Sequence, residues 1–310
     1  MNIGNTYCIH GKIETEVLSV VVAQFHPEDA GTWEEVDKNI DHIVEYMERA
    51  VSGFPGVDLI VTPEAAVQGM HATEWRNMLL DIKGPQIKRL CDKCKELDVW
   101  GIFNPWVRPS DGRFCSNLGI LINNQGEIVL KYEKMNPWTP VEMTNAGSEC
   151  PVVEGPKGSR IGIIICADGD YPEIWREAAV NGANVIVRIS HYMSPWEQAM
   201  SITNKSGAYC NQCYVVSCSA VGIDDMYSYF GRSTIINPDG TEIIAAPSGT
   251  PAIIKADLYP GIIDHMRKYA VASNPLFTYN HRGASCPDYH GKGIEKMDYN
   301  AYKTKKNGGE

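Results

Sequence analysis

Three side chains that could form a nucleophilic site occur where apolar, strand-like segments end. Cys166 follows the apolar run 161–165, Lys134 ends a β-rich run, and Glu64 ends the segment 57–64. In open α/β sheets, functional groups gather at the carboxyl ends of strands, so an acid, a cation and a thiol there suit nucleophilic catalysis. Taken singly, each also has an ordinary structural interpretation as a buried thiol, a surface lysine or a solvated acid.

The position of Cys166 favours the chemical interpretation. The run "IGIIIC" is followed by an acidic, glycine-containing turn, then by a proline and by "EIWREAA", which predicts a helix. A thiol at a helix N-terminus lies at the positive end of the helix dipole, and free N–H groups there can bind an oxyanion. We therefore expect this junction to hold Cys166 rigidly, to direct it into a cleft and to favour its thiolate.

Strand-like and helix-like segments alternate along the chain and would position these residues. The predicted strands are 17–25, 57–64, 99–107, 161–166, 184–190, 213–221 and 252–258. The predicted helices are 32–51, 86–97, 173–179 and 196–211, and hairpins are predicted at 117–134 and 233–246. Alternation favours parallel strands and hairpins favour antiparallel ones, so we expect one α/β domain with a mixed sheet.

The domain division predicted from this pattern is simple. An N-terminal extension spans 1–16, a single domain spans 17–283, and a Gly- and Lys-rich C-terminal tail spans 284–310. The 310 residues are 44% apolar and 21% charged, which is enough for a large core.

Charge and composition exclude several classes of partner. The net charge of −10 argues against nucleic acid, because phosphate binding needs a basic surface. No apolar run approaches the roughly 18–20 residues that a membrane span requires, and the N-terminus lacks a signal-peptide pattern. We expect a cytoplasmic protein whose ten cysteines are reduced, buried or catalytic rather than paired in disulfides.

Two CxxC pairs raise the alternative of a zinc site with four thiolate ligands. They are Cys91 with Cys94, and Cys210 with Cys213. The pairs are far apart in the sequence, and each lies on or at the end of a predicted helix rather than on a knuckle turn. We therefore expect no metal ion.

Longer motifs around the candidate residues resemble the nitrilase superfamily of carbon-nitrogen hydrolases. They are "TPEAAVQG", "KYEKMNPWTPVE", "ICADGDYPEIWREAAVNGANVIVR" and "YSYFGRSTIINPDG". The resemblance extends from Val17 to 281–283, and "PWTPVE" and "GDYPEIWRE" are similar to the aliphatic amidase and formamidase branch. It implies an α-β-β-α sandwich in which two mixed β-sheets carry helices on their outer faces.

The resemblance also implies a catalytic set and its roles. The set comprises Glu64, Lys134, Cys166 and Glu142, of which only Glu142 comes from the resemblance alone. Glu64 would be the general base for attack by Cys166, and Lys134 with the backbone N–H of Ala167 would stabilise the oxyanion. Glu142 would hold the substrate NH₂ group. No metal or cofactor is required, and the implied assembly is a homo-oligomer built from dimers, with a hexamer as one option.

The sequence departs from that branch beside the candidate residues. Ala65 stands where the branch has an aromatic residue, usually Tyr, which suggests a roomier or differently shaped acyl pocket. Ala167 replaces a residue that is commonly acidic or His, whereas Asp168 is retained and would orient the site. The candidates for the pocket lining are Trp138, His191 and Tyr192, for which core packing is the alternative.

These observations predict an amidohydrolase that converts a small primary aliphatic amide to the acid and ammonia through a cysteine thioester. One alternative within the superfamily is a carbamoyl-compound hydrolase or a nitrilase, because the same Glu-Lys-Cys set serves those substrates. Another is a catalytically silent binding homologue. The four intact candidate residues argue against the silent homologue, since folding alone does not require all of them.

Overall fold

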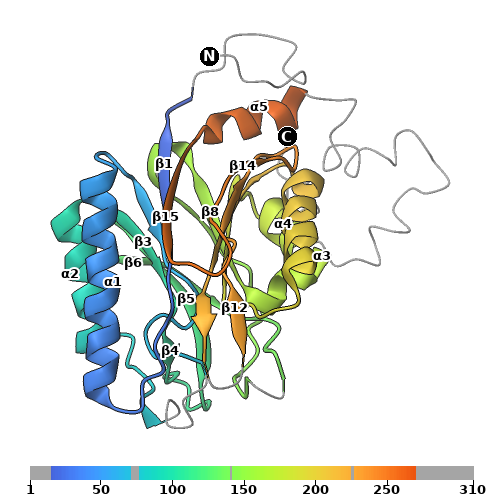
Figure 1. The fold of residues 1–310 in the computed structure, drawn as a ribbon. Coiled ribbons are helices and arrows are strands. Elements are labelled where there is room, and N and C mark those ends of the chain that lie inside the picture. Colours follow the sequence, from blue (N-terminus) through green and yellow to red (C-terminus); the bar gives the residue numbers. More distant parts are fainter. Residues whose placement is uncertain (1–14, 71–76, 140–141, 225–226, 270–310) are drawn as a thin grey trace.

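The computed structural model of the protein describes residues 15–70, 77–139, 142–224 and 227–269. Two large β-sheets pack face to face, with helices α1 and α2 on one outer face and α3 and α4 on the other (Figure 1). This arrangement confirms the α-β-β-α sandwich and corrects the expectation of one mixed sheet. Most of the proposed N-terminal extension and the whole tail 284–310 lie outside the described residues.

The first sheet has seven strands, in the order β15-β1-β2-β3-β5-β4 with β6 paired to β5. Their bounds are β1 Leu18–Gln24, β2 Leu59–Val61, β3 Trp100–Phe103, β4 Trp106–Val107, β5 Ser116–Ile122, β6 Ile128–Glu133 and β15 Ala252–Leu258. The pairs β1–β2 and β2–β3 are parallel, whereas β5 is antiparallel to both β3 and β6. Strands β2, β3 and β6 therefore run in the same direction and end at the same edge.

The second sheet has six strands, in the order β14-β13-β10-β9-β8-β7. Their bounds are β7 Val152–Glu154, β8 Arg160–Ile165, β9 Val185–Ser190, β10 Tyr214–Ser219, β13 Thr234–Ile236 and β14 Glu242–Ala245. Strands β8, β9 and β10 are parallel. A separate two-stranded ribbon pairs β11 (Val221–Ile223) with β12 (Ser228–Phe230).

The helices cover the outer faces of the two sheets. Their bounds are α1 Trp33–Gly53, α2 Pro85–Leu97, α3 Pro172–Val180, α4 Glu197–Asn211 and α5 Pro260–Tyr269, with 3-10 turns η2 Pro156–Gly158 and η3 Cys166–Asp170. Helix α1 begins after Thr32, whose hydroxyl accepts a hydrogen bond from the backbone N–H of Glu35. The sequence analysis did not predict β7, β11, β12 or α5.

Strand β1 is apolar at nearly every position because both of its faces are covered. Val20 and Val22 belong to the core cluster between the sheets, whereas Val21 and Ala23 pack in the cluster beneath α1 and α2. Side chains alternate between the two faces of a strand, so a strand covered on both faces needs apolar residues at consecutive positions.

Two predicted strands are shorter than expected, and in each case proline follows closely. Strand β2 ends at Val61, two residues before Pro63, so Glu64 lies in the loop that follows. The segment 99–107 is divided into β3 and β4, with Pro105 between them. Proline has no N–H to donate to the ladder, so it interrupts strand pairing. Among the residues described, no helix has the length and apolar character needed to cross a membrane.

Candidate active site

The candidate residues meet at the carboxyl ends of strands from both sheets. Glu64 lies three residues beyond β2 and Lys134 directly follows β6 in the first sheet. Cys166 directly follows β8 and His191 directly follows β9 in the second sheet. Hydrogen bonds across the sandwich join these ends, so the structure brings together residues that are separated by more than a hundred positions.

Lys134 lies at the centre of the cluster, between two carboxylates. Its Nζ donates to Glu64 Oε1 at 2.9 Å and to Glu142 Oε1 at 2.5 Å. All three side chains are at most 1% exposed. A buried charge is tolerated only when it is paired and hydrogen bonded, so these groups stabilise one another.

The Glu64 carboxylate is held by further donors from both sheets. Asn117 Nδ2 donates to Glu64 Oε1 at 2.9 Å, and the backbone N–H of His191 donates to Oε2 at 2.8 Å. The thiol of Cys166 is near enough to this carboxylate to help lower its pKa. Glu64 therefore has a fixed orientation beside the thiol, as a general base requires.

The residue after Glu64 adopts an unusual backbone conformation. Ala65 has a φ of 57°, in the left-handed region, and its N–H donates to Asn104 Oδ1 at 2.7 Å. Asn104 Nδ2 in turn donates to Asn117 Oδ1 at 2.7 Å. The side chain of Ala65 is fully buried in the cluster beneath α1 and α2. Its predicted contact with substrate stays a prediction.

Glu142 is held by the loop that contains Trp138. The backbone N–H of Trp138 donates to Glu142 Oε2 at 3.0 Å, and the backbone N–H of Glu142 donates to the Trp138 carbonyl at 2.8 Å. The indole of Trp138 is half-buried and meets the ring of Tyr227 edge-on, at 6.0 Å between centroids. Trp138 thus lies next to the cluster, where a pocket-lining residue would be placed.

Asp168 ties the turn that carries Cys166 to the loop that follows Lys134. Its Oδ2 accepts from the backbone N–H of Ile165 at 3.1 Å and from the Tyr132 hydroxyl at 2.7 Å. Its Oδ1 accepts from the backbone N–H and the Nδ2 of Asn136, at 2.8 and 3.0 Å. These contacts support the predicted orienting role of Asp168.

A fully buried arginine, Arg188 in β9, lies against the same turn, and sequence reasoning missed it. Its Nε and Nη2 donate to the Cys166 carbonyl at 3.0 and 2.6 Å, and Nη2 also contacts Asp170 Oδ1 at 3.2 Å. The guanidinium lies 5.2 Å from the ring centre of Tyr192, whose hydroxyl donates to Asp170 Oδ2 at 2.7 Å. The available signal was a single charged residue inside the apolar run "NVIVRIS".

Two predicted pocket residues therefore take different places. Tyr192 belongs with Arg188 and Asp170, whereas the ring of His191 packs on the ring of Tyr229 at 3.9 Å between centroids. Ala167 is partly exposed in the turn η3. The contacts of these residues with substrate stay predictions.

The pKa shifts of the cluster define its resting protonation state. Burial alone would raise the pKa of Glu64, but the charge and hydrogen bonds of Lys134 outweigh it and lower that pKa below its usual value. Burial alone would lower the pKa of Lys134, but Glu142 and Glu64 outweigh it and hold that pKa well above its usual range. Burial, opposed by Lys134 and assisted by the charge of Glu64, raises the pKa of Glu142 to about 7.

The thiol itself is protonated at rest. Burial, followed by the negative charge of Glu64, raises the pKa of Cys166 well above that of a free cysteine. The expectation that the junction favours the thiolate is therefore wrong for the resting site, because Cys166 begins a buried 3-10 turn and α3 starts only at Pro172. A neutral thiol beside an ionised carboxylate needs a proton transfer before it can attack.

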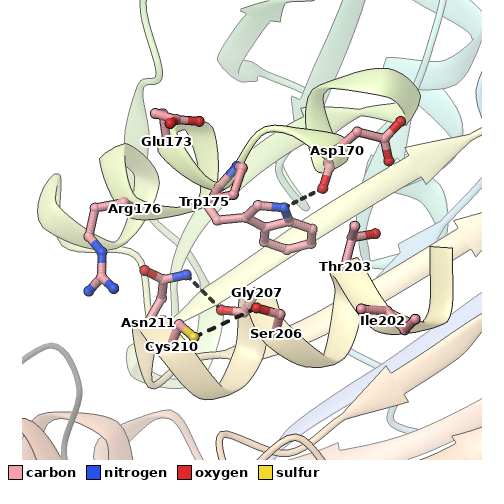
Figure 2. Close-up of a pocket in the computed structure, with 12 residues that line it drawn as sticks. Asp170, Glu173, Trp175, Arg176, Ile202, Thr203, Ser206, Gly207, Cys210 and Asn211 are labelled. Carbon is pink, nitrogen blue, oxygen red and sulfur yellow. Dashed lines mark hydrogen bonds between the residues drawn. The ribbon is translucent and has the colours of Figure 1, made fainter. Parts of the chain in front are cut away.

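A cavity of about 360 Å³ lies on the outer side of the same turn (Figure 2). Its lining comes from the end of η3 and from α3 and α4, and includes Asp170, Trp175, Thr203 and Cys210. None of the four predicted catalytic residues lines it. This cavity is therefore separate from the Glu64–Lys134–Cys166 cluster.

The two CxxC pairs lie in opposite helix layers. Cys91 and Cys94 belong to α2 outside the first sheet, whereas Cys210 belongs to α4 outside the second and Cys213 follows it (Figure 1). The two sheets stand between them, so they cannot form one four-thiolate site. Within the described residues, no group of three or more His, Cys, Asp or Glu side chains is arranged to hold a metal ion.

Comparison with known proteins decides the family. Residues 19–268 match the family described as carbon-nitrogen hydrolase. The chain belongs to this family. A formamidase from Bacillus cereus (strain AH820) is 37% identical over 252 residues, which cover 80% of this chain and 76% of the formamidase. A formamidase from Bacillus anthracis matches with the same identity and coverage. These findings confirm the resemblance to the amidase and formamidase branch of the nitrilase superfamily.

Solved structures share the fold of this carbon-nitrogen hydrolase. Nit3 of Saccharomyces cerevisiae, a member of branch 10 of the nitrilase superfamily, superposes with a TM-score of 0.74 at 22% identity, covering 83% of this chain and 96% of Nit3. A carbon-nitrogen hydrolase from Helicobacter pylori G27 gives a TM-score of 0.75 at 18% identity, covering 88% and 97%. A double mutant of the amidase from Nesterenkonia sp. AN1, in complex with acrylamide, gives 0.69 at 18% identity, covering 78% and 90%.

Proposed function

We propose that this chain hydrolyses a small primary aliphatic amide to the carboxylic acid and ammonia through a thioester on Cys166. The observation that carries the proposal is the buried cluster in which the cation of Lys134 holds Glu64 ionised beside the thiol of Cys166. The formamidases of Bacillus, at 37% identity, support the choice of an amide as substrate. A mutant of an amidase of the same fold, from Nesterenkonia sp. AN1, shows covalent addition of the acetamide moiety of fluoroacetamide at its active-site cysteine.

Acylation begins with the proton of the thiol. Glu64 accepts it while the sulfur of Cys166 bonds to the amide carbon, and the carbonyl electrons move to oxygen. Lys134 and the backbone N–H of Ala167 stabilise that negative oxygen. Glu142 accepts hydrogen bonds from the substrate NH₂ and so holds the carbonyl carbon near the sulfur. When the C–N bond breaks, the nitrogen takes the proton from Glu64 and leaves as ammonia.

Deacylation uses the same base a second time. A water molecule gives a proton to Glu64 as its oxygen bonds to the thioester carbon. The C–S bond then breaks, the acid is released, and the sulfur recovers the proton from Glu64. Because Glu64 accepts and returns one proton in each half of the cycle, the site ends in its resting state of thiol and carboxylate.

The first test is ammonia release from a panel of amides, carbamoyl compounds and nitriles, measured for the wild-type protein and for Cys166→Ala. We expect turnover of short aliphatic amides and its loss in the variant. The acyl length preferred would show whether Ala65 enlarges the pocket. Turnover of carbamoyl compounds or nitriles without amides would contradict the proposal and select the corresponding alternative within the superfamily.

A silent binding homologue would give no turnover on any part of the panel. It would also leave Cys166 no more reactive toward a thiol reagent than the other cysteines. We expect instead that Cys166 is labelled fastest, because Glu64 lies ready to remove its proton.

We also propose a cytoplasmic homo-oligomer built from dimers, with a single hydrolase domain spanning 17–283. Helix α4 exposes Ile202, which lines the cavity of Figure 2, and Tyr209, and such apolar residues suit contact with a second copy. The cysteines described are free thiols, which suits a reducing compartment.

Light scattering would measure the number of subunits, and Ile202→Asp should yield monomers. Limited proteolysis would test the proposed domain boundaries.

A further inference from the structure

Arg188 is the only fully buried arginine among the described residues, and its guanidinium is fully engaged. It donates to the Cys166 carbonyl, Asp170 Oδ1, Thr203 Oγ1 and Asn204 Oδ1. Removing a guanidinium from water is costly unless good partners replace the lost hydration. A buried cation with two partners in the turn η3 and two in α4 suggests that the turn must be held in a defined geometry.

The turn is under backbone strain where Arg188 contacts it. Cys166 has a φ of 50°, in the left-handed region that residues with a Cβ avoid. Two N–H groups of Arg188 converge on the carbonyl of this same residue. The arginine therefore holds the strained residue by its carbonyl group, not by its thiol.

The geometry of the peptide bond transfers this restraint to the next residue. The peptide between Cys166 and Ala167 is planar and trans, so its C=O and N–H point in opposite directions. When Arg188 fixes the direction of the Cys166 carbonyl, it fixes the direction of the Ala167 N–H as well. That N–H points away from Arg188, and it lies in the first turn of η3, where N–H groups have no partner within the helix.

We propose that Arg188 is a positioning residue that orients the Cys166–Ala167 peptide plane and thereby aims the Ala167 N–H at the substrate oxyanion. The inference rests on the proposed function, because it assigns Arg188 to the acyl-transfer step of that reaction. It differs from a role in activating the thiol, since the contact is made with the carbonyl of Cys166.

Gly169 supplies an independent indication that the arginine must lie close to the turn. A Cβ at this position would lie 2.2 Å from both Cζ and Nε of Arg188. Every other residue type at position 169 would therefore displace the guanidinium. Thr203 and Asn204 hold the far side of the guanidinium from α4, and Figure 2 shows Asp170 and Thr203 lining the cavity outside the turn.

The test compares two reactions of Cys166 that differ in their need for an oxyanion donor. Amide hydrolysis develops negative charge on oxygen, whereas methyl methanethiosulfonate forms a disulfide with the thiol without any carbonyl oxygen. Arg188→Lys keeps the positive charge but loses the paired contact with the carbonyl. Gly169→Ala keeps the arginine but displaces it. Arg160→Lys, at the start of β8 with its contacts to Gly182 and Asp264, is the matched control.

We expect kcat for amide hydrolysis to fall about 100-fold in Arg188→Lys and in Gly169→Ala, with KM changed less than about threefold, as for loss of one oxyanion donor. The rate of disulfide formation at Cys166 should stay within about threefold of wild type, and Arg160→Lys should behave as wild type in both reactions. Unfolding midpoints should show that the variants are folded.

Three results would overturn the inference. The first is hydrolysis within about threefold of wild type in a folded variant, and the second is a parallel fall of both reactions, which would assign Arg188 to the thiol. The third is loss of the fold in both variants, which would make the contact a folding element. If Arg188→Lys alone fails to fold, Gly169→Ala decides. Failure of the proposed function is distinguished beforehand, because wild-type protein would then release no ammonia from any amide.

Discussion

The loop that carries Glu64 and the turn that carries Cys166 both contain a residue with a positive φ, and different kinds of side chain hold the two segments in place. Each places a residue with a side chain in the left-handed region, Ala65 at a φ of 57° and Cys166 at 50°. In the Glu64 loop, the neutral amides of Asn104 and Asn117 hold the chain. In the Cys166 turn, charged groups hold it, namely Asp168 and Arg188.

The charge of each functional group accounts for this difference. Glu64 is an anion that already has a cation, Lys134, so neutral amide donors can direct it without changing the balance of charge. Cys166 is neutral at rest and has no cation of its own, and Arg188 contacts its carbonyl group rather than its thiol. The comparison suggests that neutral amides direct a residue that is already charged, whereas charged groups fix the backbone around a residue that is neutral at rest.

The largest effect is expected from a substitution that removes the charge of Glu64. Glu64→Gln should lower kcat about 1,000-fold, because a glutamine amide cannot accept the thiol proton. Its NH₂ group would also face groups that now donate hydrogen bonds to the Glu64 carboxylate. Ammonia release would measure the loss. Glu173→Gln, an exposed change on α3, should have no effect. Retention of activity in Glu64→Gln would show that another group is the base.

The next effect concerns the charged support of the Cys166 turn. Asp168→Asn should lower the free energy of unfolding by about 3 kcal/mol, because the buried carboxylate accepts hydrogen bonds from Ile165, Tyr132 and Asn136, and an NH₂ group cannot. Urea unfolding would measure it. Asp92→Asn, an exposed change on α2, should stay within about 0.5 kcal/mol of wild type. Equal stability of both variants would contradict the assignment.

A smaller effect is expected from a change to the neutral amide side chains that hold the Glu64 loop. Asn117→Leu removes one donor to Glu64 and should cost about 1–3 kcal/mol of stability, less than Asp168→Asn. The loss of that donor should also raise the pKa of Glu64, so activity should persist less far into the acid range. If Asn117→Leu proved more damaging than Asp168→Asn, the proposed contrast between neutral and charged support would fail.

The pH dependence of kcat/KM should distinguish the ionisation of Glu142 from that of Glu64. Because the pKa of Glu142 is about 7 and above its usual value, kcat/KM should rise about tenfold between pH 6 and pH 7.5 as Glu142 ionises. The sign for stability is opposite, because a group with a raised pKa in the folded state favours folding when protonated. Stability should therefore fall as the pH rises from 4.5 to about 7. Glu142→Gln should remove the pH dependence of both kcat/KM and stability in this range. If the fall of kcat/KM at acid pH were unchanged in this variant, another group would be responsible for it.

The smallest effect is expected at Ala65. Glycine tolerates a positive φ without strain, although it gains entropy in the unfolded chain, so Ala65→Gly should change the free energy of unfolding by less than about 1 kcal/mol. Thermal unfolding would measure the shift. A large loss of stability would mean that the buried methyl group, rather than the Asn104 contact, holds this loop.

The sequence predicted most helices and strands, because their apolar periodicity and their proline and glycine positions are local signals. It did not predict how the strands divide between two sheets, since a strand buried on both faces, such as β1, has the same composition in either arrangement. The short strand β7, half-buried, has too few residues for a recognisable pattern.

The candidate site was predicted to a similar degree. Strand ends identified Glu64, Lys134 and Cys166, and the family resemblance added Glu142. The protonation of Cys166 could not be predicted, because it depends on burial between both sheets rather than on its position before a helix. Arg188 and Asn117 were missed because their contacts join residues far apart in the chain.

The division of the site between the two sheets has a consequence for how the protein folds. Glu64 and Lys134 follow strands of the first sheet, Cys166 and His191 follow strands of the second, and neither half contains both the proposed base and the proposed nucleophile. During refolding from denaturant, activity cannot return before the sheets dock, even if each sheet and its helices are already formed. The recovery of ammonia release would therefore time the docking step, while far-ultraviolet circular dichroism would report the earlier formation of helices and strands.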